Sequence, residues 1–127
     1  MNKLFTAISG VFILLSSCSI WQNQNDISID KFQKKIATER YLLVDVRTAE
    51  EFADGYIKGA INIDYLAENF YVEIQELDLE TPVLLYCRSG NRSGKAMQIM
   101  YDLGFTEVKN LIGGIKGWKA ENHKLIK

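Results

Sequence analysis

The chain has 127 residues, of which 47% are hydrophobic and 24% charged, and its formal net charge is −1. This balance is typical of an ordinary globular domain. No basic stripe or alternation of basic and aromatic residues is present, so we expect no nucleic-acid partner.

The N-terminal segment has the features of a leader that is removed from the mature protein. Lys3 precedes an apolar run at residues 4–15, and small residues then end at Cys18. The run is shorter than the roughly 20 apolar residues of a transmembrane helix, so we interpret residues 1–17 as a signal peptide. The sequence Leu-Ser-Ser-Cys at 15–18 resembles the bacterial lipobox, in which the Cys is lipidated and becomes the mature N-terminus. A core helix or an ordinary signal peptide with a chance Cys are the alternatives.

Lipidation at Cys18 implies a location in the bacterial cell envelope, on the periplasmic side of the inner or outer membrane. Removing the leader leaves about 110 residues, enough for one domain with a hydrophobic core, and the loss of Lys3 changes the net charge from −1 to about −2. Residues 18–26 would then be the lipidated Cys and a short tether, followed by a domain at 27–127.

Beyond the tether, apolar runs alternate with segments of helical periodicity. Phe32 and Ile36 share one face of a first predicted helix. The apolar run at 41–46 predicts a buried strand. Thr48 and Glu51 have the spacing of a capping box and predict the start of a second helix.

The second half of the chain continues this alternation. A short strand is predicted at 60–63, a helix with Phe70, Ile74 and Leu77 on one face follows, and the next strand is predicted at 83–86. The next helix has apolar residues at the spacing i, i+3, i+4 and i+7, namely Ala96, Ile99, Met100 and Leu103.

Gly104 is predicted to end that long helix. The last strand, at 108–112, leads through Gly113 and Gly114 into a short helix around Trp118, a residue that we expect in the core. This order predicts an α/β domain with a mainly parallel sheet, in which ligands bind beyond the carboxyl ends of the strands.

The two cysteines, Cys18 and Cys87, restrict the chemistry. Neither belongs to a CxxC motif or a Cys/His cluster, so we expect no metal and no cofactor. If Cys18 is acylated, Cys87 is the only thiol, and an exported protein with one thiol has no internal disulfide. Because neither a metal site nor a disulfide explains Cys87, we expect this residue to have a chemical function.

Cys87 directly follows a predicted strand and opens a loop that leads into a helix. Backbone N–H groups of such a loop, including Ser89, Gly90 and Asn91, can surround one anionic atom, with the positive end of the helix behind them. We therefore expect a depressed pKa for the Cys87 thiol. Arg88 and Arg92 add positive charge that can hold an anionic substrate.

Two other interpretations of Cys87 are less consistent with its surroundings. A cysteine nucleophile is usually activated by a histidine, but nothing in the sequence places the only one, His123, near Cys87, and a papain-like protease is not expected. A lone Cys is often a small buried hydrophobe. Two arginines and a glycine turn beside it favour a reactive thiol instead.

Three motifs of this chain resemble those of the single-domain rhodanese family. They are Cys87-Arg88-Ser89-Gly90-Asn91-Arg92-Ser93, the upstream segments 45–47, 51–52 and 55–63, and Gly113-Gly114 with Gly117-Trp118. The resemblance extends over residues 27–125. It implies a five-stranded parallel sheet with helices on both faces. It also implies a sulfurtransferase in which Cys87 takes a sulfane sulfur from thiosulfate, polysulfide or a persulfide and passes it to a thiol or cyanide. The sequence does not reveal the oligomeric state, and a monomer is our expectation.

Two rival functions have different signatures. Phosphatases and arsenate reductases of this fold carry one more residue between the Cys and the Arg, whereas Arg92 here lies five positions after Cys87, which favours sulfur over phosphate. A non-catalytic module that stores or carries persulfide at the membrane is the second rival. Unloading rates with different acceptor thiols would distinguish a carrier from a catalyst.

The remaining motif residues are expected to support the site. Asp45 ends a strand, and an Arg47–Glu51 ion pair is expected to lock the following loop. Tyr56 and Lys58 stand where the family usually has His and Pro. Ser89 replaces a second cation of some thiosulfate-specialised members, so thiosulfate is expected to be a poor donor.

Overall fold

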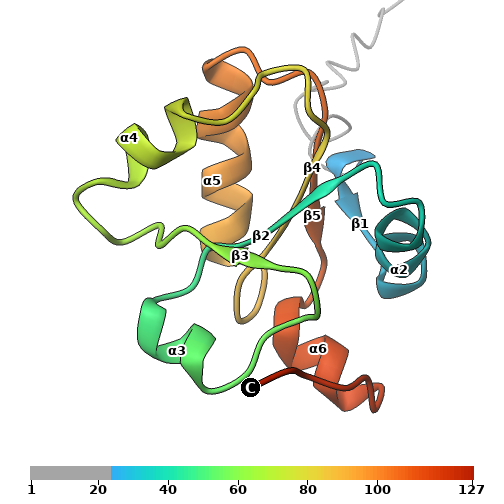
Figure 1. Ribbon diagram of the computed structural model, residues 1–127. Helices are drawn as coiled ribbons and strands as arrows, with labels where there is room; N and C mark the ends of the chain where they lie inside the picture. The colour runs from blue at the N-terminus through green and yellow to red at the C-terminus, as the bar shows by residue number, and fades with distance from the viewer. Residues whose placement is uncertain (1–23) are drawn as a thin grey trace, which may run out of the picture.

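The computed structural model describes residues 24–127, and the predicted leader and Cys18 lie outside this part of the chain. Strands and helices alternate along it (Figure 1). In chain order the elements are β1 (Asp26–Ile27), α2 (Ile29–Ala37), β2 (Leu42–Asp45), α3 (Ala49–Ala53), β3 (Ile61–Asn62), α4 (Phe70–Gln75), β4 (Val83–Tyr86), α5 (Asn91–Asp102), β5 (Val108–Leu111) and α6 (Gly114–Ala120).

The five strands form one sheet in the order β1-β5-β4-β2-β3, and all neighbouring strands are parallel. The predicted α/β fold with a five-stranded sheet is therefore confirmed. β4 lies at the centre of the sheet, and its four residues are fully buried. The carboxyl end of this strand leads directly into the loop that begins with Cys87.

The hydrophobic core is divided between the two faces of the sheet. Val83 and Leu85 pack with α4 and α5, while Leu84 and Tyr86 point to the other face and pack with α2 and α6 (Figure 1). Trp118 of α6 is buried and meets Phe32 of α2 edge-on. Because β4 is covered on both faces, its sequence is a continuous apolar run rather than an alternating one.

Local signals fix the ends of two helices. The Thr48 hydroxyl accepts from the Glu51 N–H, and the Glu51 carboxylate accepts from the Thr48 N–H, which confirms the capping box at the start of α3. Gly104 has a φ of +100° after the end of α5, where the predicted helix stop lies. The N–H groups of Gly104 and Phe105 bond back into the last turn, as in a Schellman motif.

The described domain begins slightly before the predicted boundary. Asp26, which we expected in the tether, belongs to β1 and pairs with Asn110 of β5. Just before it, the side-chain oxygen of Asn25 accepts hydrogen bonds from the Tyr101 hydroxyl and the Lys109 ammonium group. Two residues are too short a run for periodicity to predict, so β1 depends on its pairing with β5.

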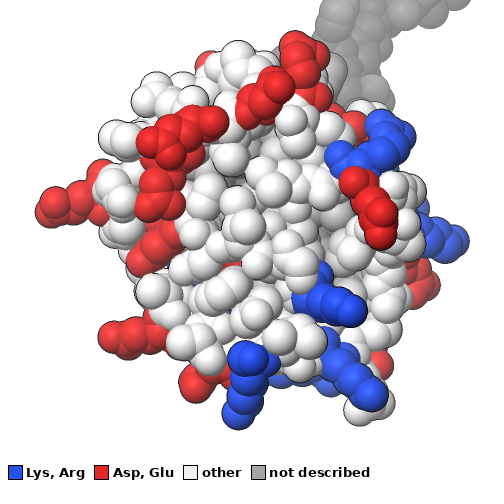
Figure 2. Space-filling view, viewed as in Figure 1, with Lys and Arg blue, Asp and Glu red and all other residues white. Residues whose placement is uncertain are grey.

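Charged side chains are unevenly distributed on the face shown in Figure 2. Acidic side chains gather over the region of α4 and lie also at the lower left, where Figure 1 has α3, whereas Lys and Arg side chains lie on the right and at the bottom, around α2, α6 and the C-terminus. This face therefore has an acidic side and a basic side. Within residues 24–127, no helix is long and apolar enough to cross a bilayer.

Candidate active site

Cys87 lies at the carboxyl end of β4, and its residue is only 1% exposed. The chain then turns through Arg88, Ser89 and Gly90 into α5, which begins at Asn91. Gly90 is the N-cap residue and has a φ of +100°, a conformation that glycine adopts without strain. This turn brings the start of α5 back toward the sulfur of Cys87.

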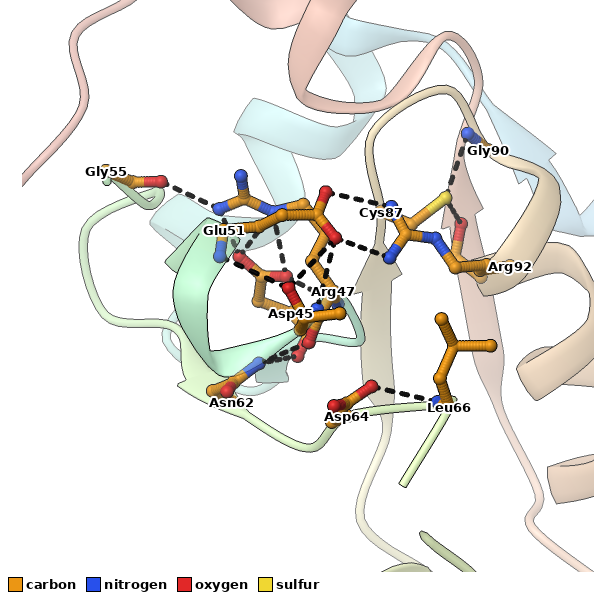
Figure 3. Close-up of polar contacts among 12 residues, drawn as sticks. Asp45, Arg47, Glu51, Gly55, Asn62, Asp64, Leu66, Cys87, Gly90 and Arg92 are labelled. Atoms are coloured by element: carbon orange, nitrogen blue, oxygen red, sulfur yellow. Dashed lines mark hydrogen bonds and ion pairs between the residues drawn. The ribbon is translucent and has the colours of Figure 1, made fainter. Parts of the chain in front are cut away.

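Two donors meet the sulfur directly. The Gly90 N–H lies 3.1 Å from Cys87 Sγ, and the Ser93 hydroxyl oxygen lies 3.2 Å from it (Figure 3). Burial disfavours the thiolate, but hydrogen bonds from the Ser93 hydroxyl and from the N–H groups of Ser93, Ser89 and Gly90 outweigh it, and the pKa of the Cys87 thiol is lowered. The direction agrees with the expectation from the sequence.

The start of α6 fixes the backbone of the cysteine loop. The N–H groups of Ile115 and Lys116 donate to the carbonyl oxygens of Cys87 and Arg88, at 2.9 and 3.0 Å. Because the C=O and N–H of one peptide unit point in opposite directions, these bonds turn the N–H of Ser89 away from α6. The Gly113-Gly114 motif thus holds the loop that surrounds the sulfur.

The predicted Arg47–Glu51 ion pair is wrong. Glu51 instead binds Arg92 with both carboxylate oxygens, at 2.7 and 2.9 Å (Figure 3). Spacing of four residues predicts a contact only inside a helix, and Arg47 lies in a bend before the N-cap Thr48. Arg92, which we expected to hold an anionic substrate, therefore has its charge offset within the protein.

Arg47 forms a buried pair with Asp45. Its Nη2 atom lies 2.7 Å from Asp45 Oδ2 and 2.7 Å from the Gly55 carbonyl oxygen, and its Nε also donates to the carboxylate. The Asn62 amide then donates to the carbonyl oxygens of Asp45 and Arg47. These bonds tie the end of β2 to β3 and to the turn after α3, so Asp45 and Arg47 support the site structurally.

The other predicted loop residues lie at the surface. Arg88, Ser89 and Asn91 are exposed, so their side chains are accessible to a molecule that approaches Cys87. His123 lies elsewhere: its ring packs on Trp118, and its Nδ1 is 3.2 Å from the Gln33 amide nitrogen. Within the described part of the chain, no group of three His, Cys, Asp or Glu side chains could hold a metal.

The two departures from the family pattern make contacts outside the cysteine loop. Tyr56 stacks on Phe52 of α3 with ring centroids 4.2 Å apart, and its backbone pairs with Ile126 near the C-terminus. Lys58 is exposed. These contacts join α3 to the C-terminal segment.

Three residues of the site had no role in the sequence prediction. Ser93 belongs to the quoted loop motif, but its contact with the sulfur requires the first turn of α5 to face Cys87. Asn110 is a buried polar residue within β5, and a polar residue inside an apolar strand is the signal that could have marked it. Gly114 was part of a motif, but its contact with the cysteine loop is tertiary.

The pKa of Glu51 predicts a pH-dependent stability. Its hydrogen bond with Arg92, aided by Thr48 and opposed by burial, lowers the pKa of Glu51 from 4.5 to about 2. A lowered carboxylate pKa stabilises the fold above the unfolded value, and this contribution is lost as the pH falls from 4.5 toward 2. We expect urea denaturation to show a flatter loss of stability in this pH range for Glu51→Gln than for the wild type. The exposed neighbour gives the control variant Glu50→Gln, and equal pH slopes for all three proteins would contradict the assignment.

Comparisons with known proteins agree with this geometry. The sequence model of the rhodanese-like domain family matches residues 28–121 of this chain. A sulfurtransferase of Allochromatium vinosum is 36% identical over 103 residues, covering 80% of this chain and 94% of that protein. The crystal structure of a rhodanese-related protein from Thermoplasma volcanium superimposes with a TM-score of 0.72 at 25% identity, over 80% of this chain and 97% of that one. The human single-domain sulfurtransferase TSTD1 gives a TM-score of 0.65 at 28% identity, over 76% and 96%. The chain belongs to the rhodanese-like family.

Proposed function

We propose that this rhodanese-type sulfurtransferase carries sulfane sulfur as a persulfide on Cys87. The observation that carries the proposal is the convergence of the Gly90 N–H and the Ser93 hydroxyl on a buried sulfur atom. Preorganised donors around one atom stabilise negative charge there, as in an oxyanion hole.

The reaction has two displacements at sulfur. The Cys87 thiolate attacks the outer sulfur of the donor, and a new S–S bond forms. The donor's own bond to that sulfur breaks, and its electron pair leaves on sulfite from thiosulfate, on a thiolate from a persulfide, or on a shorter polysulfide or hydrosulfide from polysulfide. An acceptor thiolate or cyanide then attacks the outer sulfur of the Cys87 persulfide. The Cys87–sulfur bond breaks, and the Cys87 thiolate is restored with no net change of oxidation state in the protein.

Charge around the loop favours anionic donors. Arg88 is exposed directly after Cys87 and adds positive charge there. Arg92 contributes less because Glu51 binds both ends of its guanidinium group. Polysulfide and low-molecular-weight persulfides are therefore the proposed preferred donors, and thiosulfate is proposed as a slower one. A relative from Shewanella oneidensis is named a thiosulfate sulfurtransferase, which supports thiosulfate as a donor.

Phosphate-ester hydrolysis is less consistent with the same loop. Arg92 lies five positions after Cys87, and its guanidinium group is bound by Glu51 rather than directed at an empty anion site. The short segment from Cys87 to Arg92 has fewer backbone N–H groups to place around the three oxygens of a phosphoryl group.

Steady-state assays of Cys87→Ser test the proposed function. We expect the wild type to transfer sulfur to cyanide from thiosulfate, polysulfide or a persulfide, and we expect the variant to have no transfer above the uncatalysed rate because serine cannot form a persulfide. Cys18→Ser is the matched thiol control and is expected to keep full activity. Hydrolysis of an aryl phosphate that is lost in Cys87→Ser, without sulfur transfer, would instead establish a phosphatase.

The N-terminal segment supports a lipid anchor as a separate proposal. Cys18 ends a lipobox-like sequence, and only residues 19–25 separate it from β1, so the domain would lie close to the periplasmic surface of a membrane. Labelling of cells with radioactive palmitate is expected to mark the wild type and not Cys18→Ala. Equal labelling of the two proteins, or no label on either, would contradict this anchor.

A further inference from the structure

Asn110 is a buried polar residue beside the cysteine loop. It lies in β5, is 4% exposed, and its carboxamide contacts Ser93, Asp26 and the backbone of Gly90. A carboxamide that contacts three elements in the interior has a defined orientation, because each of its atoms must match a donor or an acceptor.

The contacts of Asn110 fix which way its amide points. Its Nδ2 donates to Asp26 Oδ1 at 2.9 Å and to the Gly90 carbonyl oxygen at 3.2 Å. Both partners are acceptors, so the nitrogen must face them. The other end of the amide, Oδ1, therefore faces the Ser93 hydroxyl oxygen at 2.5 Å.

Ser93 has one hydroxyl proton and two acceptors for it. Its oxygen lies 2.5 Å from Asn110 Oδ1 and 3.2 Å from Cys87 Sγ. When Cys87 is a thiol, the S–H can donate to the Ser93 oxygen while the hydroxyl donates to Asn110, and every group has a partner. When the sulfur is charged, the hydroxyl must turn toward it, and Asn110 Oδ1 loses its donor.

We propose that Asn110 is a positioning residue that acts on the Cys87 sulfur through Ser93. It competes with the sulfur for the Ser93 proton, so it favours the protonated resting thiol, while Ser93 favours the charged sulfur. The inference deepens the sulfur-transfer function proposed above and rests on it only for its role in turnover. Its chemical consequence is a control on how much reactive thiolate the resting protein holds.

Other charged groups surround the same sulfur. Arg88 lies in the loop itself, and the ion pairs Arg92–Glu51 and Arg47–Asp45 lie on the side of α3 and β2. Asp26 approaches from β1 through Asn110. A double-mutant cycle between Asn110 and Ser93 leaves all of these charged groups in place. Their contributions to the pKa of Cys87 therefore cancel when the effect of Asn110→Ala is compared with and without Ser93.

The test is the pH dependence of Cys87 alkylation by iodoacetamide, measured in the full chain on the peptide that contains Cys87. Removal of one hydrogen bond changes a pKa by about half a unit to one unit. We expect Ser93→Ala to raise the pKa of Cys87 and Asn110→Ala to lower it by about that amount. In the double variant the pKa should equal that of Ser93→Ala, because Asn110 acts only through the hydroxyl.

Each alternative outcome overturns the inference. If Asn110 served only to anchor the Gly90 carbonyl, Asn110→Ala would raise the pKa of Cys87 and would do so equally with and without Ser93. Should Asn110→Ala fail to fold by circular dichroism, Asn110→Leu keeps the size of the buried side chain without an acceptor beside Ser93, and an unchanged or raised pKa for that variant would refute the competition. No sulfur donor is present in these measurements, so their failure is separate from a failure of sulfur transfer.

Discussion

Gly114→Ala is expected to damage the cysteine loop and the fold together. A Cβ atom at Gly114 would lie 2.5 Å from the carbonyl carbon and oxygen of Arg88 and 2.6 Å from the Cys87 oxygen, and these are backbone atoms that cannot rotate away. The φ of +57° adds the strain of a left-handed conformation. We expect a loss of about 2 to 4 kcal/mol in the free energy of unfolding.

The same substitution should also reduce sulfur transfer. Moving α6 away from the loop breaks the bonds from Ile115 and Lys116 that orient the Cys87 and Arg88 carbonyls. Gly59→Ala is the matched control, since its φ is +91° but no atom lies within 4 Å of the added Cβ. It should cost about 1 to 2 kcal/mol and leave turnover unchanged. Equal effects of the two variants in urea denaturation and in kcat would contradict the role of the close approach.

Asp45→Asn is expected to destabilise the protein by about 3 to 5 kcal/mol, because it leaves the buried Arg47 without its carboxylate. Asp45 is fully buried and accepts from the backbone and the guanidinium group of Arg47. Asparagine keeps the shape but removes the charge and turns an N–H₂ group toward a donor. Urea denaturation at neutral pH measures the loss.

Glu51→Gln provides the comparison within the same site. The Glu51–Arg92 pair has side chains that are 31% and 22% exposed, so solvent screens it. We expect this variant to cost no more than about 1 kcal/mol at neutral pH. Losses of similar size for Asp45→Asn and Glu51→Gln would show that burial does not set the energetics of these two pairs.

Local sequence signals were sufficient for most of the secondary structure. The strand at 83–86 has the predicted bounds, and the Thr48–Glu51 capping box and the Gly104 helix stop are confirmed. The predicted strand at 41–46 is longer than β2, because apolar residues continue into the loop beyond the last paired residue. An apolar run indicates which residues are buried, and buried residues continue beyond the last residue that pairs with a neighbouring strand.

Contacts between residues that are far apart in the sequence could not be predicted from these local signals. Glu51 pairs with Arg92, a residue 41 positions away, and the four-residue spacing from Arg47 to Glu51 led to the wrong partner. The Cys87 loop was identified because its residue types are unusual for a strand end. The second strand that completes the site, with Asn110 beside Ser93, depends on the order of strands in the sheet.

Mass spectrometry of the intact protein and of its peptides, after treatment with polysulfide or thiosulfate, tests whether Cys87 holds a persulfide. We expect a gain of one sulfur atom on the peptide that contains Cys87, its loss on addition of cyanide or a thiol, and no gain in Cys87→Ser. A wild-type protein that gains no sulfur from any of these donors, or gains it equally when Cys87 is replaced, would contradict a persulfide held by the cysteine loop.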